Sequence, residues 1–306
     1  KWEPLGHIQT HAKSTYTLVF RLSAENDRVY LFTRALNYHP SALTSDDDGE
    51  TWSEPVQLID VGRGRPYQRM VSDGISRIHV AFTTGHPRNE KNNSVYYFYY
   101  ENGACYRADG TFIRKWKDLP VLPDEADLVY DGSTKGRAWT WDLAIGTDDH
   151  PVIAHGVYPQ ENDHRYYYAS WDGAKWSSKE ITRAGRWFPE TSKGAKEREP
   201  HYSPGYSLDH HDPSIVYLSK HIDEDTGPVE VQRWTTQDSG DSWSSRSITS
   251  SSNGLNVNPV GNWGFPYGSK PAQTMIFWMN GRYRHYTDYS TSIRYWIEDE
   301  SIYDYE

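Results

Sequence analysis

The chain has 306 residues, including 13 Trp and 24 Tyr, and hydrophobic residues make up only 36% of it. This composition argues against a protein that spans a membrane, because no apolar run approaches the roughly 20 residues of a bilayer-crossing helix. Disorder is not expected either, since a chain so rich in Trp and Tyr can bury ample surface. Abundant Tyr, Trp, Thr, Gly and Pro favours β structure.

The formal net charge is −10. We therefore expect no nucleic-acid partner and no anionic-membrane partner, because such binders carry a basic balance. The single cysteine, Cys105, excludes an internal disulfide and a cysteine-based zinc cluster. The chain begins at Lys1 without Met or an apolar leader, which is typical of a processed or trimmed protein.

The first four periods of the chain each offer three strand candidates: an inner strand, a β-branched or aromatic strand, and a third strand. In chain order they are Tyr16–Leu22, Val29–Thr33 and Ser41–Ser45; Tyr67–Ser72, Ile78–Thr83 and Ser94–Tyr100; Thr140–Ile145, Pro151–Gly156 and Arg165–Trp171; Tyr202–Leu208, Ile215–Ser219 and Glu230–Thr236. The last period, from Val257 to Trp296, offers Met275–Met279 and His285–Asp288.

Two octapeptides follow third strands with the shared pattern Ser/Thr-x-Asp-x-Gly-x-Thr/Ser-Trp. They are Ser45–Trp52 and Thr236–Trp243, with weaker echoes at Arg107–Thr111 and Trp171–Trp176. Asp and Gly at these offsets predict a tight turn in which the Asp side chain accepts hydrogen bonds from backbone N–H groups. The spacing of Trp52, Phe112, Trp176 and Trp243 gives a period of about 60 to 67 residues, which suits a four-stranded propeller blade with long loops.

We therefore predict an all-β fold in which residues 1–306 form a single β-propeller of five blades. The last blade lacks one strand, and we expect the N-terminal segment Trp2–Ile8 to supply it and close the ring. The two octapeptides are the Asp-box signature, and the chain resembles the BNR-repeat β-propellers. In those proteins the Asp boxes lie on the outer rim, so the resemblance implies structural roles for Asp47, Trp52, Asp238 and Trp243.

Ligands of a propeller usually sit over the central channel, at the starts of inner strands and on the loops between strands. The residues expected there are rich in His, Arg, Tyr and Trp, although the chain as a whole is acidic. They include His11, Lys13, Arg34 and His39; Arg65, Tyr67, His86, Arg88, Asn92 and Asn93; Trp139, Trp141, Asp142, His155, His164 and Arg165; Arg198, Glu199, His201 and Tyr202; and Asn256, Asn258 and Trp263.

These residue types match the needs of β-elimination on a uronic-acid polysaccharide. Trp and Tyr stack on sugar rings, and Arg clamps a carboxylate with two parallel hydrogen bonds. His and Tyr can move protons, which removal of the C5 proton and protonation of the leaving oxygen both require. The predicted substrate is therefore an anionic polysaccharide or oligosaccharide, and the predicted protein is secreted or periplasmic.

The first blade adds a second resemblance. His11 before a strand, followed by Arg34 and His39 on a loop, resembles the first active-site blade of the BNR-type polysaccharide lyases, which include ulvan lyases and rhamnose–glucuronate lyases. By position His11 matches the inner-strand His of those families, and Arg34, His39 or His86 falls near their loop His. Those families often have seven blades, whereas this chain is predicted to have five.

The resemblance and the residue chemistry assign roles. His86 is the base or a neutraliser, with His11 its alternate, and Tyr202, supported by His201, is the acid or base. Arg65, Arg88 and Arg165 hold the carboxylate and Trp141 stacks, with Asn93 and His164 among the substrate-binding residues. No cofactor and no metal are assigned.

Several of these residues also have a structural reading. His86 before a Pro could be a turn residue, Trp141 a core residue, and Arg65 and Arg88 ion-pair partners of Asp142 or Glu199. By contrast, His150, His210 and His211 lie in Asp-rich turns and are predicted to be surface residues.

Two other function classes compete with the lyase. A glycoside hydrolase needs two carboxylates roughly 5 to 10 Å apart, and Asp142 and Glu199 are the candidates. A non-catalytic sugar-binding propeller would show the same aromatic platforms and Arg clamps. A sialidase is disfavoured, because the Arg-Ile-Pro motif that usually precedes its first blade is absent.

Overall fold

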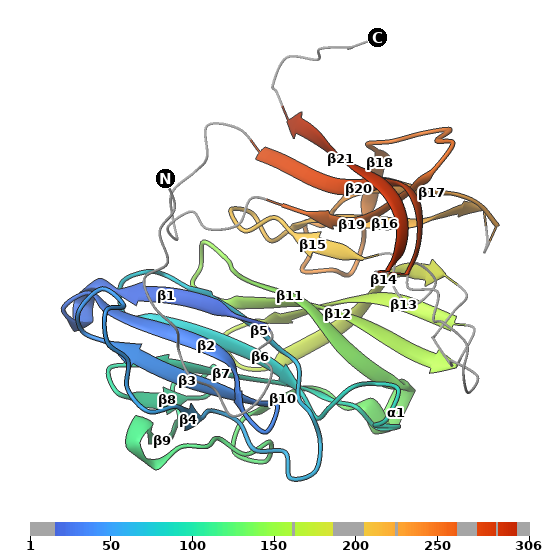
Figure 1. The fold of residues 1–306 in the computed structure, drawn as a ribbon. Helices are drawn as coiled ribbons and strands as arrows, with labels where there is room; N and C mark the ends of the chain where they lie inside the picture. The colour runs from blue at the N-terminus through green and yellow to red at the C-terminus, as the bar shows by residue number, and fades with distance from the viewer. Residues whose placement is uncertain are drawn as a thin grey trace.

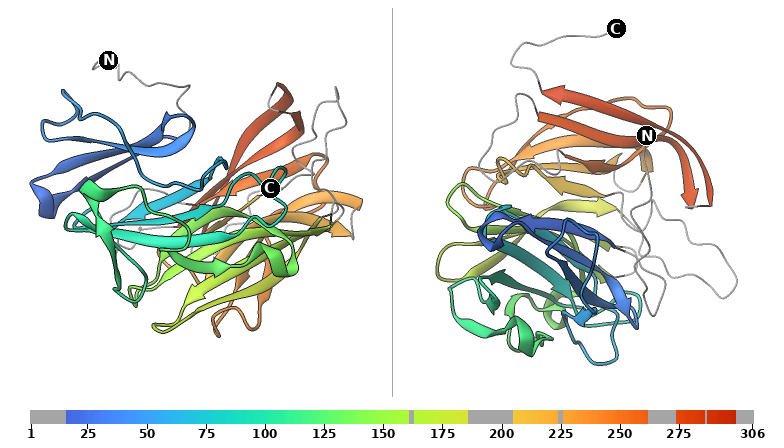
Figure 2. Two further views of the ribbon diagram at one scale, coloured as in Figure 1. Left: turned by 90° about the horizontal axis from the view of Figure 1, so that it is seen from below. Right: turned by 60° about the vertical axis from the view of Figure 1, so that its left-hand side comes forward.

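The computed structural model describes residues 16–160, 163–185, 205–223, 226–261, 274–285 and 287–298, and these residues form five antiparallel sheets. We number the sheets 1 to 5 in chain order. They follow one another along an arc (Figure 1 and Figure 2). The fold is all-β, as the composition predicted. The N-terminal segment Trp2–Ile8 lies outside the described residues, so the predicted ring closure and the blade count stay predictions.

Sheets 1 to 5 are built from consecutive strands, and sheet 2 has two additional strands, β9 and β10, with β10 pairing β7. Sheet 1 contains β1 (Leu18–Leu22), β2 (Arg28–Leu36), β3 (His39–Ser45) and β4 (Val56–Gln57); sheet 2 contains β5 (Gln68–Ser72), β6 (Arg77–Thr83), β7 (Val95–Glu101), β8 (Ala104–Tyr106), β9 (Phe112–Lys115) and β10 (Asp127–Tyr130); sheet 3 contains β11 (Arg137–Ile145), β12 (Pro151–Gln160), β13 (Asp163–Trp171) and β14 (Trp176–Gly185); sheet 4 contains β15 (Tyr206–Leu208), β16 (Ile215–Asp223), β17 (Thr226–Thr235) and β18 (Ser244–Ser247); sheet 5 contains β19 (Leu255–Val260), β20 (Thr274–His285) and β21 (Asp288–Glu298).

Helical structure in the described residues is confined to one turn of α-helix and two short 3-10 helices. The α-helix α1 (Gly132–Lys135) begins after Asp131, whose side chain accepts a hydrogen bond from the backbone N–H of Ser133 and so caps the first turn. The 3-10 helices are η1 (Ser23–Glu25) and η2 (Trp116–Asp118).

The last sheet corrects one predicted strand. His285–Asp288 does not form a strand of its own but joins the end of β20 to the start of β21. Pairing runs from Thr274 opposite Glu298 to His285 opposite Asp288, so the two long strands form a hairpin that these residues close. Sheet 5 has three strands within the described residues, one fewer than sheets 1, 3 and 4.

Strands in the middle of the arc are buried on both faces because each sheet lies between two neighbours. In β6, Ile78, Val80 and Phe82 join the core shared with sheet 1. The alternate residue Ala81 joins the core shared with sheet 3. Successive side chains of a strand point to opposite faces, so a single strand supplies both cores.

The two octapeptide turns share one hydrogen-bond pattern. In the first, Asp47 accepts hydrogen bonds from the backbone N–H of Thr51 at 2.8 Å and from the hydroxyl of Ser45 at 2.8 Å. In the second, Asp238 accepts equivalent bonds from Ser242 and Thr236. The hydroxyl of Ser242, which also donates to Asp238, and these two bonds lower the pKa of Asp238 to about 2, below its ordinary value.

The inner strands run in the same direction around the arc, so their starts share one end. The rings of Tyr67 and Trp139, at the starts of β5 and β11, have centroids 5.3 Å apart. Further along, the backbone N–H of Leu208 in β15 bonds Asp142 of β11, and Gly205 packs against Asn258 of β19. The ends of β6, β16 and β20 come to this same side, because each pairs antiparallel with the inner strand before it. We call this side of the molecule the mouth face.

Candidate active site

Aromatic and basic side chains of sheets 1, 2 and 3 meet at the mouth face. The guanidinium carbon of Arg34 lies 4.3 Å from the ring centroid of Tyr67 and 4.7 Å from that of Tyr16. The Tyr67 ring in turn contacts His86 at 5.4 Å and Trp139 at 5.3 Å between centroids. We call these five residues the mouth cluster. Arg34 is only 5% exposed and donates a hydrogen bond to the carbonyl of Pro66, so its charge is fixed beside the two phenols.

The geometry of His86 defines which of its nitrogens carries the proton. Its Nδ1 accepts a hydrogen bond from the backbone N–H of Arg88 at 3.0 Å. Burial, together with the positive charges of Arg88 and Arg34, lowers the pKa of His86 to about 4. The imidazole is therefore neutral at pH 7, and because Nδ1 is an acceptor the proton sits on Nε2. His86 thus stands in the mouth cluster as a neutral imidazole.

The loop that carries His86 is held to sheet 3 by Asn93. Its Oδ1 accepts a hydrogen bond from Gly85 N–H at 2.7 Å, and its Nδ2 donates to the carbonyls of Gly85 at 2.9 Å and Ala138 at 2.7 Å. Asn93 is fully buried. Its amide is committed to backbone groups, so the prediction that it binds substrate is wrong and its role is to position the loop.

Tyr16 completes the cluster on the side of sheet 1. Its ring packs edge-on against Tyr67, with centroids 5.2 Å apart. Burial and the neighbouring Tyr67 raise the pKa of Tyr16, while Arg34 acts in the opposite direction. Its hydroxyl is therefore protonated at neutral pH and can donate a proton or a hydrogen bond.

Two cavities share Arg69 and Trp141 as lining residues. The first, about 200 Å³, is bordered by Tyr16, Tyr67 and Trp139 of the cluster together with Gln68 and Thr140. The second, about 260 Å³, is bordered by Asp142, Ser207 and Asn258 on the side of sheets 4 and 5.

Polar groups around these cavities lack partners. The side-chain amide of Gln68, the hydroxyl of Thr140 and the indole N–H of Trp141 are buried without a hydrogen bond. Arg69 makes no hydrogen bond or ion pair with any described residue, and burial lowers the pKa of its guanidinium although Asp142 opposes this. Buried polar groups are ordinarily satisfied, so three unsatisfied side chains beside the half-buried Arg69 are typical of a site that binds a polar or anionic group.

Both carboxylate oxygens of Asp142 accept hydrogen bonds from neighbouring protein groups. It is 3% exposed and accepts hydrogen bonds from Ser207, from the backbone N–H groups of Leu143 and Leu208, and from His210 at 3.1 Å. Burial would raise the pKa of Asp142, but His210 and these N–H groups lower it overall. The prediction that His210 is a surface residue is wrong, because its side chain is 12% exposed and pairs with Asp142.

The comparisons with known proteins agree with this architecture. Residues 2–184 match a protein family whose description is "BNR repeat-containing family member". The chain belongs to this BNR-repeat family. No curated protein matches it.

Solved structures with similar folds include two kinds of enzyme. An ulvan lyase of family PL25, solved bound to -[GlcA(1-4)Rha3S]-, is 15% identical with a TM-score of 0.64, covering 93% of this chain and 64% of the lyase. A sialidase of Trypanosoma rangeli is 10% identical with a TM-score of 0.52, covering 95% of this chain and 47% of the sialidase. This BNR-repeat chain thus spans less than two thirds of the length of either enzyme. At these identities the likeness is one of fold.

The remaining predicted site residues of the BNR-repeat chain divide into three sets. Arg65 is exposed, with its guanidinium carbon 4.6 Å from the ring centroid of Tyr38, and Arg88 contacts His86 through its backbone. Arg165 is committed to ion pairs with Asp163 and Glu180, each at 2.8 Å, and His164 is 2% exposed against Tyr158. The structure therefore does not bring Arg165 and His164 to the mouth cluster. His11, Glu199, His201 and Tyr202 lie outside the described residues.

Sequence reasoning missed Arg69 and Tyr16 as site residues. Arg69 stands between Gln68 and Met70 in the middle of an inner strand, and an Arg there is the signal that could have identified it. Tyr16 was counted as the first residue of a strand, whereas it precedes β1 with a left-handed φ of 59°. No group of three or more His, Cys, Asp or Glu side chains in the described parts of the chain is arranged to hold a metal ion, and no described helix is long and apolar enough to cross a membrane.

Proposed function

We propose that this BNR-repeat chain is a carbohydrate-active propeller whose reaction is lyase cleavage of a uronic-acid-containing polysaccharide at the mouth cluster. The observation that supports this proposal most strongly is Arg34, a buried cation held between the phenols of Tyr16 and Tyr67 and next to the neutral His86. A carboxylate neutraliser, two proton-transfer groups and aromatic platforms stand together there. These are the groups that β-elimination needs.

The roles follow from the protonation states. Nε2–H of His86 donates a hydrogen bond to the substrate carboxylate, which makes the proton at C5 more acidic. Tyr67, whose ring lies against the Arg34 guanidinium, is the base that removes that proton. The electron pair of the C5–H bond forms the C4=C5 double bond, and the bond from C4 to the glycosidic oxygen breaks. Tyr16, whose raised pKa keeps it protonated, donates a proton to the leaving oxygen.

A hydrolase built on Asp142 receives no support from the geometry. A general acid or nucleophile needs a carboxylate oxygen that can reach substrate, and both oxygens of Asp142 already accept hydrogen bonds from protein groups. The proposed localisation is secreted or periplasmic, which is where a polysaccharide substrate would be met.

Incubation with a panel of uronic-acid polysaccharides tests the proposal, with ultraviolet absorbance reporting the unsaturated uronate. We expect the absorbance to rise with wild-type protein and the rate to fall at least about 100-fold in Tyr67→Phe, because removal of an acid–base group costs 10²–10⁴-fold. Tyr295→Phe, which removes a hydroxyl from a side chain 63% exposed on β21, is the matched control and should retain full activity. Reducing ends without absorbance would replace the lyase by a hydrolase, and no cleavage at all would leave a sugar-binding propeller.

A further inference from the structure

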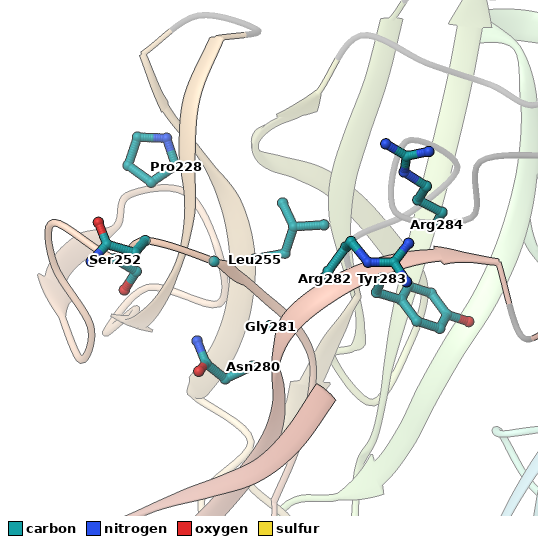
Figure 3. Close-up of a pocket in the computed structure, with 10 residues that line it drawn as sticks. Pro228, Ser252, Leu255, Asn280, Gly281, Arg282, Tyr283 and Arg284 are labelled. Carbon is teal, nitrogen blue, oxygen red and sulfur yellow. The ribbon is translucent and has the colours of Figure 1, made fainter. Parts of the chain in front are cut away.

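A third cavity opens between sheets 4 and 5, away from the mouth cluster. It has a volume of about 660 Å³ and shares no lining residue with the two cavities beside Arg69. Figure 3 shows Pro228 on one side and Arg282 on the other, with Leu255 between them. This volume lies within the range of small-molecule sites and holds a unit of one or two sugars.

The cavity is on the mouth face. Pro228 lies near the start of β17, Leu255 is the first residue of β19, and Arg282–Arg284 lie near the end of β20. Leu255 is three residues before Asn258, which is level with Gly205 at the start of β15. A polymer lying across the mouth cluster therefore meets this cavity on the same side of the molecule.

The floor of the cavity is rigid because a buried carboxylate organises it. Glu230 is fully buried and accepts hydrogen bonds from the backbone N–H of Ser252 at 2.7 Å and from Asn256 at 2.9 Å, and also from Thr249. Asn256 in turn accepts from Asn280 at 2.8 Å. Ser252 and Asn280, two polar lining residues, are thus held in place before any ligand arrives.

Two glycines, Gly254 and Gly281, allow the backbones of β19 and β20 to lie close together at the edge of the cavity. A Cβ on Gly281, whose φ is +138°, would lie 2.5 Å from the carbonyl oxygen of Ser290. A Cβ on Gly254 would lie 3.0 Å from the Cα of Gly281. Neither position accepts a side chain without a shift of the backbone, so β19 and β20 stay in close contact at the edge of the cavity.

The lining combines apolar, hydrogen-bonding and positively charged groups. Arg282 forms a 2.8 Å ion pair with Asp288, whereas the exposed Arg284 makes no hydrogen bond or ion pair with any described residue. Leu255 and Pro228 offer apolar surface for a sugar ring, and Asn253 offers an amide for its hydroxyls. Because Asp288 balances the charge of Arg282, Arg284 is the guanidinium that this lining offers to an anion.

We propose that this cavity is a second carbohydrate subsite that binds an acidic sugar unit, through its carboxylate or sulfate, at a distance from the cleaved bond. The inference rests on the proposed function, because it takes the same polymer as ligand. Arg284 binds the anionic group, and the uncharged lining residues bind the ring that bears it.

Affinity electrophoresis tests the subsite without requiring cleavage. Native gels would contain ulvan, alginate (carboxylate only), dextran sulfate (sulfate only) or a neutral galactomannan, and Arg284→Ala would be compared with wild type. Arg294→Ala is the matched control, since it removes an equal charge from an exposed position on β21 that does not line the cavity. We expect Arg284→Ala to weaken retardation by an acidic polymer about tenfold, the loss of one charge-assisted contact, and Arg294→Ala to leave it within twofold. Alginate and dextran sulfate identify which anion is bound.

A kinetic comparison separates this inference from the lyase. On a polymer that the protein cleaves, Arg284→Ala should raise KM and leave kcat unchanged, and on a disaccharide-length substrate both constants should stay at wild-type values. Arg284-dependent retardation without any cleavage would support the subsite and overturn the lyase. Cleavage with equal behaviour of the Arg284→Ala and Arg294→Ala variants would overturn the subsite and keep the lyase, and absence of retardation by every acidic polymer would also overturn the subsite.

Discussion

Two charged residues on the mouth-facing half of the molecule, the buried Glu230 and the half-buried Arg69, have opposite surroundings. Glu230 in sheet 4 is surrounded by donors from Thr249, Ser252 and Asn256. Arg69 in sheet 2 is bordered by two cavities and makes no hydrogen bond or ion pair with any described residue. A charge that the protein satisfies completely stabilises the fold, whereas one that it leaves unsatisfied costs stability and is retained for a ligand. The two residues therefore predict opposite responses to mutation.

The largest effect is expected at the satisfied charge. Glu230→Ala should lower the free energy of unfolding by about 3 kcal/mol, because several buried donors lose their acceptor together. Urea unfolding followed by Trp fluorescence measures this change. Glu50→Ala, at an exposed position in the first octapeptide turn, removes the same charge and should be neutral. Equal unfolding midpoints for the two variants would show that the hydrogen bonds of Glu230 do not stabilise the fold.

The unsatisfied charge should behave in the opposite way. Arg69→Met should leave the free energy of unfolding unchanged or raise it by about 1 kcal/mol, because an unpaired guanidinium is replaced by an apolar side chain. The same variant should lower kcat/KM on the cleaved polysaccharide about tenfold or more. Arg233→Met is the matched control for stability, since Arg233 is paired with Glu298 and its loss should destabilise the protein. A clear loss of stability in Arg69→Met would show that the residue serves the fold.

The ion pair between His210 and Asp142 sharpens the comparison through pH. Asp142 raises the pKa of His210, although burial acts in the opposite direction. Stabilisation from a raised pKa is fully present below the unfolded value of about 6.5 and is lost as pH rises through the folded pKa. His210→Gln keeps a hydrogen-bond donor but loses the charge, so it should be less stable than wild type by about 1 kcal/mol at pH 5.5 and nearly equal at pH 9. Urea unfolding across this range checks the sign, which a constant difference would contradict.

The smallest effect is expected at His86, because its burial already keeps the imidazole uncharged at neutral pH. The pKa of His86 is lowered to about 4, so the residue stays neutral in the folded protein between pH 7 and pH 5. Protonation of His86 should therefore change kcat/KM less than twofold over that interval and lower it as pH approaches 4. Titration of the His86 ring by NMR provides an independent reading, and protonation near pH 6.5 would contradict the environment described here.

The sequence predicted much of the sheet structure because alternation and turn chemistry are local. The β6 candidate began one residue late and ended at Thr83 with the observed strand, and the turns at Asp47 and Asp238 formed with the expected backbone bonds. Predictions failed where a long hairpin replaced two short strands, as at His285–Asp288. The polar sequence of that connection gives no signal that the two flanking strands pair along their whole length.

The site was harder to predict because partners from different sheets decide each residue's role. His86 was correctly placed at the mouth face, but the sequence could not show that Arg34 from sheet 1 lies beside it. Arg165 and Asn93 were assigned to substrate because their types suit a sugar, and only the structure reveals Asp163, Glu180 and Ala138 as their partners. His210 was taken for a surface residue because Asp142, its partner, is 68 positions away.

The hydrogen bonds of Asn93 have a consequence for the dynamics of the mouth. Because one amide bonds both Gly85, within the loop, and Ala138 of sheet 3, the His86 loop cannot open without also releasing sheet 3 from sheet 2. Ala138 N–H, which bonds the carbonyl of Asn93 at 2.8 Å, and Gly85 N–H should therefore exchange with solvent in one shared opening event. Separation of these two sheets is then the motion that dismantles the site, so the docking of neighbouring sheets sets how long the His86 loop keeps its place.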